Sequence, residues 1–448
     1  MSNVQQSSYW LRSGFLTLTE RAFGLIFAFG TAALLLRGLS KEAFAAWGVF
    51  LIVAYFVEMG RNGLIQNGLI RFLALHRHDK DDYAAISTAS LTINIGFSIL
   101  TNLGLWLLTA PLARTLHTPE IIDTIPVYFM TNLVMALFSH FNFVQQANFE
   151  FRGIFWSTFS YRGGLFFWIL AGKLAGWPLQ LPQLALAMLG GALVGTAGSW
   201  LYARPFLRHS PRIAPSWIIK LVAYGKYVLG TNLSTMFYKN IDKLTLGHLL
   251  GPAAFAVYDA AAKVTQLVET PSFSIAQIVF PRSAERMETD GAAGIKHLYE
   301  YSVAAIMAII LPFILLVLLF AEPIVWVFAG GQYSAAADIM RLTAFFGFFM
   351  PFAVQFGTIL DSTGKPNVNF AYTLLTAAVN LVLSYYFVGR YGLFGAAFAT
   401  LTTYAICFIL MQRYLYKKFK INPLNVLLLL PELYKTGWNL IKTKVAAA

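Results

Sequence analysis

The stretch VAAIMAIILPFILLVLLF runs from Val303 to Phe320 without a single charged or amide side chain. An α-helix needs about 20 predominantly apolar residues to cross a hydrocarbon core of roughly 30 Å. Inside lipid, every backbone amide must find a partner within its own segment, so such a stretch is expected to form a helix. This stretch therefore predicts a membrane-spanning helix.

Eleven further apolar stretches of similar length flank this one, and only short polar turns separate them. Together they predict an all-α membrane protein with twelve transmembrane helices and no soluble domain to carry the function. The expected spans are Phe15–Leu36, Phe44–Ile65, Ile86–Leu108, Ile125–Phe143, Phe155–Leu174, Leu184–Ala203, Val222–Leu249, Ala253–Phe280, Val303–Phe320, Ile339–Leu360, Phe370–Val388 and Leu393–Tyr414.

Composition agrees with a chain that is almost wholly embedded in the bilayer. Of 448 residues, 58% are hydrophobic and 12% are charged. The net charge of +13 does not indicate nucleic acid binding, because the basic residues are dispersed in turns between apolar runs. A single cysteine, Cys407, rules out an intramolecular disulfide. The first apolar run contains Glu20 and Arg21 and lacks a small-residue cleavage site, so we expect a retained span rather than a signal peptide.

The Lys and Arg residues of the turns predict the orientation of the chain. Eighteen of them lie in one set of alternate turns and six in the other. The basic set marks the cytoplasmic side and places both termini there. Beyond Lys420, Leu424–Leu430 is followed by Pro431 and by a face of Tyr434, Trp438 and Ile441. This tail is too short and too broken to span, and we expect an amphipathic segment on the inner leaflet.

The chain resembles itself at an offset of about 211 residues. The turn after the first span contains Ala43-Phe44-Ala45-Ala46-Trp47, and the turn after the seventh contains Ala254-Phe255-Ala256-Val257-Tyr258. Likewise, Pro111 at the end of the third span falls opposite Pro323 at the end of the ninth. Short matches of this kind also arise by chance. Six spans on each side with the same starting orientation are nevertheless what a parallel two-lobe repeat requires.

A duplication of this kind predicts two six-helix lobes around a central cavity, with alternating access by rocking of one lobe against the other. It indicates a transporter. The expected boundaries are an N-terminal lobe at 1–204, a cytoplasmic connector at 205–217, a C-terminal lobe at 218–420 and a cytoplasmic amphipathic tail at 421–448.

Several short motifs occur in order along these spans. They are Arg37-x-Leu39-x(4)-Phe44 with Gly48, Gly251-x(6)-Tyr258, Pro281-x(3)-Glu285, Pro323-Ile324 before Gly330-Gly331, and Gly364-Lys365-Pro366. In their order and spacing, over residues 10 to 420, the chain resembles the polysaccharide-repeat flippases of the multidrug/oligosaccharidyl-lipid/polysaccharide exporter superfamily. The resemblance implies a MATE-like fold and a flippase that moves an undecaprenyl-diphosphate-linked oligosaccharide from the inner to the outer leaflet of the bacterial inner membrane.

Other classes fit the residues less well. The turn from Arg71 to Arg77 lacks the Gly-x(3)-Asp-Arg pattern of the major facilitator group. The segment Asp361–Pro366 is no phosphate loop, because it lacks the first Gly and ends in Pro where a hydroxyl is needed. We expect no nucleotide, cofactor or metal. A membrane polymerase or acyltransferase would show a large outward loop with paired acidic or His residues, whereas the longest here is about Ala321–Asp338, so we do not expect an enzyme.

Charged residues inside the expected spans are the candidate site, because each costs about 2.5–3.5 kcal/mol at a helix centre unless it faces a cavity or a partner. Some have partners on their own helix: Glu58 with Arg61 and Asp259 with Lys263 lie one turn apart. Lys239, Asp242 and Lys243 form a triad that can neutralise itself, and Arg21 and Arg61 can extend to the headgroups.

A lipid diphosphate cannot enter apolar surroundings without compensating cations. In the resembled fold, spans one, two, seven and eight form the inner gate. We therefore expect Arg21, Arg61, Lys239 and Lys263 to bind the diphosphate. A desolvated Asp242 or Asp259 is the candidate for proton or sodium coupling, although the membrane potential acting on the cargo is an alternative. Amides such as Asn94, Asn102, Asn132 and Asn380 either line a sugar path or make ordinary interhelical hydrogen bonds.

Two rival functions remain open at this point. A cation-coupled drug or toxin exporter has the same architecture but needs acids in its cavity. A scaffold or receptor has no need of a duplication. The expected partners are a lipid-linked oligosaccharide, membrane lipids and a glycan polymerase. A single chain with both lobes needs no second copy to form a pathway, so we expect a monomer. The identity of the glycan and of the coupling ion does not follow from the residues.

Overall fold

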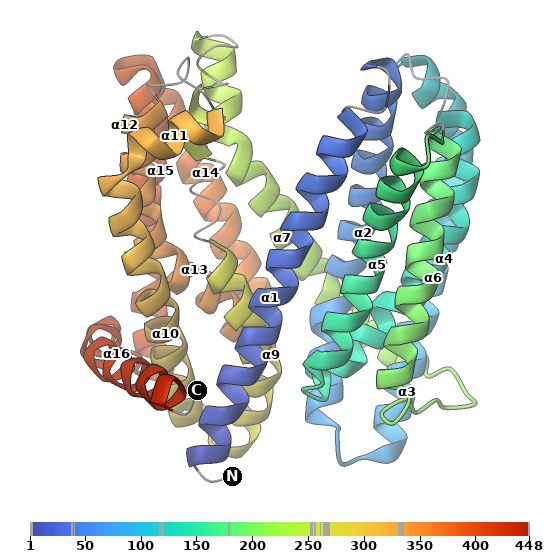
Figure 1. Ribbon diagram of the computed structural model, residues 1–448. Helices are drawn as coiled ribbons and strands as arrows, with labels where there is room; N and C mark the ends of the chain where they lie inside the picture. The colour runs from blue at the N-terminus through green and yellow to red at the C-terminus, as the bar shows by residue number, and fades with distance from the viewer. Residues whose placement is uncertain are drawn as a thin grey trace. The chain divides into compact units, whose positions relative to one another are not determined.

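The computed structural model describes residues 3–36, 39, 41–115, 121–177, 180–250, 254, 257–259, 261–262, 269–329 and 336–446 (Figure 1). Within these ranges every regular element is a helix and no strand occurs. The helices are α1 (Asn3–Leu36), α2 (Lys41–Leu75), α3 (Lys80–Thr115), α4 (Ile121–Ala147), α5 (Phe151–Leu174), α6 (Leu181–Ala203), α7 (Pro215–Leu250), α9 (Glu269–Thr289), α10 (Gly291–Leu319), α11 (Ala321–Ala329), α12 (Ala336–Ala344), α13 (Phe346–Ser362), α14 (Pro366–Tyr391), α15 (Leu393–Phe419) and α16 (Pro423–Ala446).

The chain divides into two compact units, Met1–Leu229 (the first unit) and Gly230–Ala448 (the second unit). The division falls inside α7, so this helix contributes its start to one unit and its end to the other. The segment expected as a connector packs on the first unit. Its Ser210 amide donates to Thr88 Oγ1 at 2.9 Å, and Trp217 Nε1 donates to Asp82 Oδ1 at 3.2 Å.

Seven of the described helices are long and apolar enough to cross a membrane, or eight if the bent pair α12 and α13 is one span. The other expected spans coincide with α1, α5, α7 and the region of α9. Each of these carries charges within the expected apolar run, for example Arg21 in α1, Arg162 in α5 and Lys239 in α7. The chain is a multi-pass membrane protein. Of the candidate site residues, Arg21, Lys239 and Asp242 lie in helices outside this apolar set, whereas Arg61 lies in α2, which belongs to it.

Helix order repeats between the two units in the register expected from the sequence. Helix α3 begins at Lys80 and α10 begins at Gly291, a separation of 211 residues. The repeat is closest over these first elements, because later helices of the second unit begin a few residues further on.

Two segments differ from their expected form. The tenth span is broken into α12 and α13, which meet at an angle of 45° next to Phe345. At the bend, the Phe345 amide donates to the Leu342 carbonyl oxygen, three residues back, at 3.3 Å. Pro351 lies six residues further on, inside α13. The longest outward loop, expected at Ala321–Asp338, contains the short helix α11.

The C-terminal tail also differs. It forms one helix, α16, that continues through Pro431 instead of breaking there. This helix packs against α10 and crosses the helices of its own unit at a steep angle (Figure 1). Glu300 of α10 accepts hydrogen bonds from the Asn422 backbone amide at 2.9 Å and from Asn425 Nδ2 at 3.1 Å. The buried carboxylate therefore fixes the start of α16 to α10, while Asn422 caps the helix by accepting a hydrogen bond from the Leu424 amide at 3.1 Å.

Glycines allow α5 and α6 to pack closely in the first unit. A Cβ at Gly191 of α6 would lie 2.7 Å from the Tyr161 carbonyl oxygen and 3.7 Å from the Gly164 Cα of α5. The neighbouring Gly190 has open space at the same position. Small residues at such crossings are the usual means of bringing membrane helices together.

We expect Gly191→Ala to destabilise the protein by about 1–3 kcal/mol, because the backbone of α5 must move away from the new methyl group. The matched variant Gly190→Ala adds the same methyl group on the open side and is expected to be neutral or stabilising, since Ala favours a helix. Thermal unfolding in detergent measures both. Equal melting temperatures for the two variants would contradict this account of the packing.

Candidate functional site

A pocket opens within the second unit and contains most of the charges predicted for spans seven and eight. Its volume, counted as the space open to the centres of water molecules, is about 80 Å³. We call it the α7 pocket. It is lined by Tyr238, Lys239, Asp242, Lys243, Tyr258, Ala262, Glu269, Thr343, Phe346, Gly347, Met350, Thr400 and Tyr404.

Helical spacing brings the charges of α7 to one side. Lys239, Asp242 and Lys243 are three and four residues apart and therefore share a helix face. The two cations pair with acids from the next span. Lys239 Nζ lies 2.5 Å from Glu269 Oε2, and Lys243 Nζ lies 2.5 Å from Asp259 Oδ1. The cations of α7 thus have partners outside their own helix.

These pairs differ from the partners that spacing along one helix indicated. The α7 triad does not neutralise itself, since both lysines bind acids of the following segment. The expected partner of Asp259 was Lys263, which lies outside the described residues. The Lys239 side chain is 32% exposed and that of Lys243 is 11% exposed. Lys239 is therefore the cation of α7 that a ligand in the pocket reaches more easily.

Among the described residues, Asp242 has hydroxyl and amide neighbours and makes no ion pair with a cation. Tyr258 Oη donates to Asp242 Oδ2 at 3.1 Å, and Thr400 Oγ1 donates to the same oxygen. Asn380 Nδ2 in turn donates to Thr400 at 3.2 Å. Ser384, one turn after Asn380 on α14, also lies beside the carboxylate.

Three oxygens at this position are buried and lack a hydrogen bond among the described residues: Asp242 Oδ1, Asn380 Oδ1 and Ser384 Oγ. We call Asp242, Asn380, Ser384 and Thr400 the Asp242 cluster. One carboxylate surrounded by neutral oxygens is the type of donor set that binds a small hard cation. Sequence reasoning named Asp242 but missed Ser384 and Thr400. The one signal in the sequence was that Ser384 follows Asn380 by four residues, on the same helix face.

Aromatic rings form another wall of the α7 pocket. The Tyr238 and Tyr404 rings meet edge to face, with centroids 5.8 Å apart. Tyr404 also contacts Phe346, and its hydroxyl donates to Met350 Sδ at 3.4 Å. Flat rings with a polar edge are suited to contact with sugar faces.

Arg61 lies deep in the first unit, with 2% of its surface exposed. Its Nη1 donates to Asn132 of α4, at 3.2 Å to the backbone oxygen and 2.9 Å to Oδ1. Asn132 Nδ2 continues to Asn102 Oδ1 of α3 at 2.8 Å. No ion pair within 4.0 Å joins Arg61 to Glu58 in the described part of the chain. Arg61 therefore lies buried against Asn132 and makes no direct ion pair with Glu58, although the Glu58 charge is near enough to act on it.

Arg21 is half-buried on α1, next to Glu20. A shallow pocket beside them is lined by Glu20, Gly24 and Thr158 and includes a further cation, Arg162 of α5. A Cβ at Gly24 would lie 2.5 Å from Arg162 Nη1, so the guanidinium group lies directly over this glycine. Sequence reasoning did not include Arg162 in the site.

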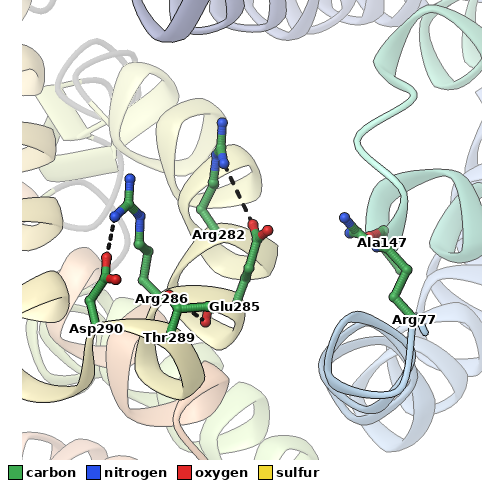
Figure 2. Close-up of polar contacts among 7 residues, drawn as sticks. All are labelled: Arg77, Ala147, Arg282, Glu285, Arg286, Thr289 and Asp290. Atoms are coloured by element: carbon green, nitrogen blue, oxygen red, sulfur yellow. Dashed lines mark hydrogen bonds and ion pairs between the residues drawn. The ribbon is translucent and has the colours of Figure 1, made fainter. Parts of the chain in front are cut away.

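Arginines at the predicted cytoplasmic helix ends bind carbonyl groups and acids, as Figure 2 shows for each unit. In the first unit, Arg77 Nη2 donates to the carbonyl oxygen of Ala147, the last residue of α4, at 2.5 Å. In the second unit, Arg282 pairs with Glu285 at 3.5 Å, and Arg286 pairs with Asp290. The hydrogen bond from Arg286 lowers the pKa of Asp290 below its ordinary value. These arginines therefore have partners at the ends of helices, and we assign cargo binding to the α7 pocket instead.

Comparison with known proteins agrees with the resemblance noted in the sequence. A family model described as "Polysaccharide biosynthesis protein" matches residues 34–338, which is more than half of the chain. The chain belongs to this polysaccharide biosynthesis family. The match covers helices of both units and includes Arg61, Lys239 and Asp242.

Relatives in the family come from archaea and bacteria. A probable low-salt glycan biosynthesis flippase of Haloferax volcanii is 23% identical over 195 residues, 44% of this chain and 41% of the relative. A succinoglycan biosynthesis transport protein of Rhizobium meliloti is 24% identical over 365 residues, 79% of this chain and 69% of the relative. The chain spans about two fifths of the length of the Haloferax relative it matches.

Solved structures show the fold. An outward-facing multidrug resistance MATE family transporter of the MOP superfamily has a TM-score of 0.79 at 15% identity, over 92% of this chain and 97% of that one. A MOP superfamily transporter from Pyrococcus furiosus has a TM-score of 0.77 at 14% identity, over 91% and 95%. The expected all-α, MATE-like fold is confirmed.

Proposed function

We propose that this protein is a flippase that moves an undecaprenyl-diphosphate-linked oligosaccharide repeat unit across the bacterial inner membrane by alternating access between two lobes. It would act in the synthesis of a cell-surface polysaccharide, with both termini in the cytoplasm. The family match and the relatives named as a glycan flippase and a succinoglycan transport protein support transport in polysaccharide synthesis. The excess of basic residues in one set of turns supports the orientation.

The observation that carries the proposal is the α7 pocket, which combines a reachable cation with sugar-compatible walls. Lys239 pairs with Glu269. A diphosphate brings more negative charge than one carboxylate and competes for the lysine. The Tyr238 and Tyr404 rings lie in the same pocket, where the first sugars can contact them. Arg21, Arg61 and Lys263 are the further cations of this proposal.

Energy coupling belongs to the Asp242 cluster in this scheme. A sodium ion would take oxygens from Asp242, Asn380 and Ser384, and a proton would occupy the carboxylate itself. Either would neutralise a buried negative charge, so its binding and release can favour different states of the transporter. Asp259 is the weaker coupling candidate, because Lys243 already compensates its charge.

Single replacement of Arg21, Arg61, Lys239 or Lys263 by Gln tests diphosphate binding. We expect each variant to lose surface polysaccharide in a deletion strain, because the diphosphate then has one cation fewer to bind it. Export is compared at equal protein level in the membrane, so that any loss of stability is separated from the loss of transport. Lys417→Gln, which removes an exposed charge at the end of α15, is the matched control and should export normally. Normal export by all four variants would refute this assignment.

A drug or toxin exporter is the rival function on the same fold, which the solved multidrug transporters share. The family match supports the flippase, because it is to polysaccharide biosynthesis proteins. Binding assays with the purified protein decide between them: a polyprenyl-diphosphate oligosaccharide should bind, and a lipophilic cation should not compete with it.

A further inference from the structure

A polar stripe runs along the buried face of α3 in the first unit, apart from the α7 pocket. Ser87, Ser90, Asn94 and Ser98 follow one another at three- and four-residue spacing, so they share one side of the helix. All four are 0% exposed. From Ser87 to Asn102 the stripe extends about 22 Å along the helix axis, most of a hydrocarbon core of roughly 30 Å.

The facing helix α4 presents its own polar residues to this stripe. Asn132, Ala136 and His140 lie four residues apart, on one face of α4, and are also fully buried. At one end, Ser87 Oγ lies 3.4 Å from His140 Nε2. At the other end, Ser98 Oγ donates to the Asn132 backbone oxygen at 3.3 Å. The helices are therefore joined by direct hydrogen bonds at both ends of the stripe.

Between these two contacts the chain of hydrogen bonds is interrupted. Ser90 Oγ, Asn94 Nδ2, Asn94 Oδ1 and His140 Nδ1 are buried and have no hydrogen-bond partner among the described residues. Ala136 is the α4 residue midway between Asn132 and His140, and its methyl group can satisfy none of them. Buried polar groups normally have partners, and ordered water commonly supplies those that the protein lacks.

We propose that the α3–α4 interface holds a file of ordered water molecules that joins His140 to the Arg61–Asn132 group. The four unpartnered atoms supply both donors and acceptors, and each internal water typically makes about three hydrogen bonds. One mouth of the file lies at His209 in the loop after α6, whose exposed ring stacks on His140 with centroids 6.5 Å apart. The proposal is independent of the cargo.

The file has a consequence for Arg61. This guanidinium group is buried and its Nε has no partner in the described part of the chain. A charge in lipid without a carboxylate within 4.0 Å needs other polar compensation. Water bound by Ser90 and Asn94 would then be separated from the Arg61 charge by a single residue, Asn132, which is hydrogen-bonded to the guanidinium group. The first unit can then keep a cation deep in the membrane without neutralising it.

X-ray hydroxyl-radical labelling of the full chain in lipid nanodiscs, read by mass spectrometry, tests for the water. Radicals form at bound water, so His140 should be modified although it is 0% exposed. Met307 is equally buried, among aliphatic residues of α10, and should remain unmodified although methionine is the more reactive residue. Labelling of His140 no faster than that of Met307 would overturn the proposal.

The variant Asn94→Leu provides a second test, because its melting temperature should change in opposite directions for a hydrated and for a dry interface. If water fills the interface, the leucine displaces it, leaves Ser90 and His140 unpartnered, lowers the melting temperature and reduces His140 labelling severalfold. If the interface is dry, the same change removes two unsatisfied polar atoms and raises the melting temperature. Asn132→Leu is the control for loss of a directly bonded amide and should lower it in either case. A raised melting temperature for Asn94→Leu alone would be enough to reject the water file.

Discussion

Asp242→Asn is expected to abolish the response of the transporter to its coupling cation while leaving the chain folded. The amide has the shape of the carboxylate and can still accept from Tyr258 and Thr400. It lacks the charge, which at about 4 Å contributes about 4 kcal/mol at an effective dielectric constant of 20. That loss corresponds to a decrease in cation affinity on the order of 1000-fold.

Thermal unfolding measures this effect, because a bound ion stabilises the folded state. If sodium is bound, the melting temperature of the unchanged protein should rise with sodium concentration at fixed pH. If a proton is bound, the melting temperature should fall as the pH rises at fixed sodium concentration. Asp242→Asn should show neither response and should not support polysaccharide export. Asp290→Asn, at an exposed helix junction, is the control that keeps both. If Asp242→Asn retains both the response to the cation and the export of polysaccharide, Asp242 is not the coupling site.

Lys239→Gln is expected to reduce both stability and export, and a second substitution should separate the two effects. The single variant leaves the Glu269 carboxylate partly buried without its cation, which costs about 1–3 kcal/mol. In Lys239→Gln/Glu269→Gln neither charge remains, so the stability should return toward that of the unchanged protein. Export should stay lost, because the diphosphate still lacks its lysine.

The Lys243–Asp259 pair is the matched control for this cycle. The same cycle of single and double amide substitutions should show the same loss and recovery of stability. Export should recover as well in the double variant, since coupling is assigned to Asp242 rather than to Asp259, and the Lys243 side chain is only 11% exposed and is assigned no contact with cargo. Loss of export in this double variant would move the coupling site to Asp259. If Lys239→Gln/Glu269→Gln also exports normally, the lysine has a structural role and the pocket binds diphosphate by other groups.

Local spacing predicted some features of the site and missed others. It placed Lys239, Asp242 and Lys243 on one helix face, because residues three and four apart always share a face. It could not assign Glu269 to Lys239, because that contact depends on how two helices approach. It also missed the bend at Phe345 and the unbroken course of α16, where packing against α10 outweighs the effect of Pro431.

The amino-acid sequence by itself determined that the chain is a bundle of membrane-spanning helices, because only helices satisfy the backbone of long apolar runs in lipid. It also determined which helices carry buried charge. Only the tertiary structure decided the partners of those charges: Thr400 for Asp242, 158 residues away in the chain, and Asn132 for Arg61, 71 residues away. The physical reason is that a partner on another helix is selected by the rotation and crossing of whole helices, which many distributed packing contacts set together.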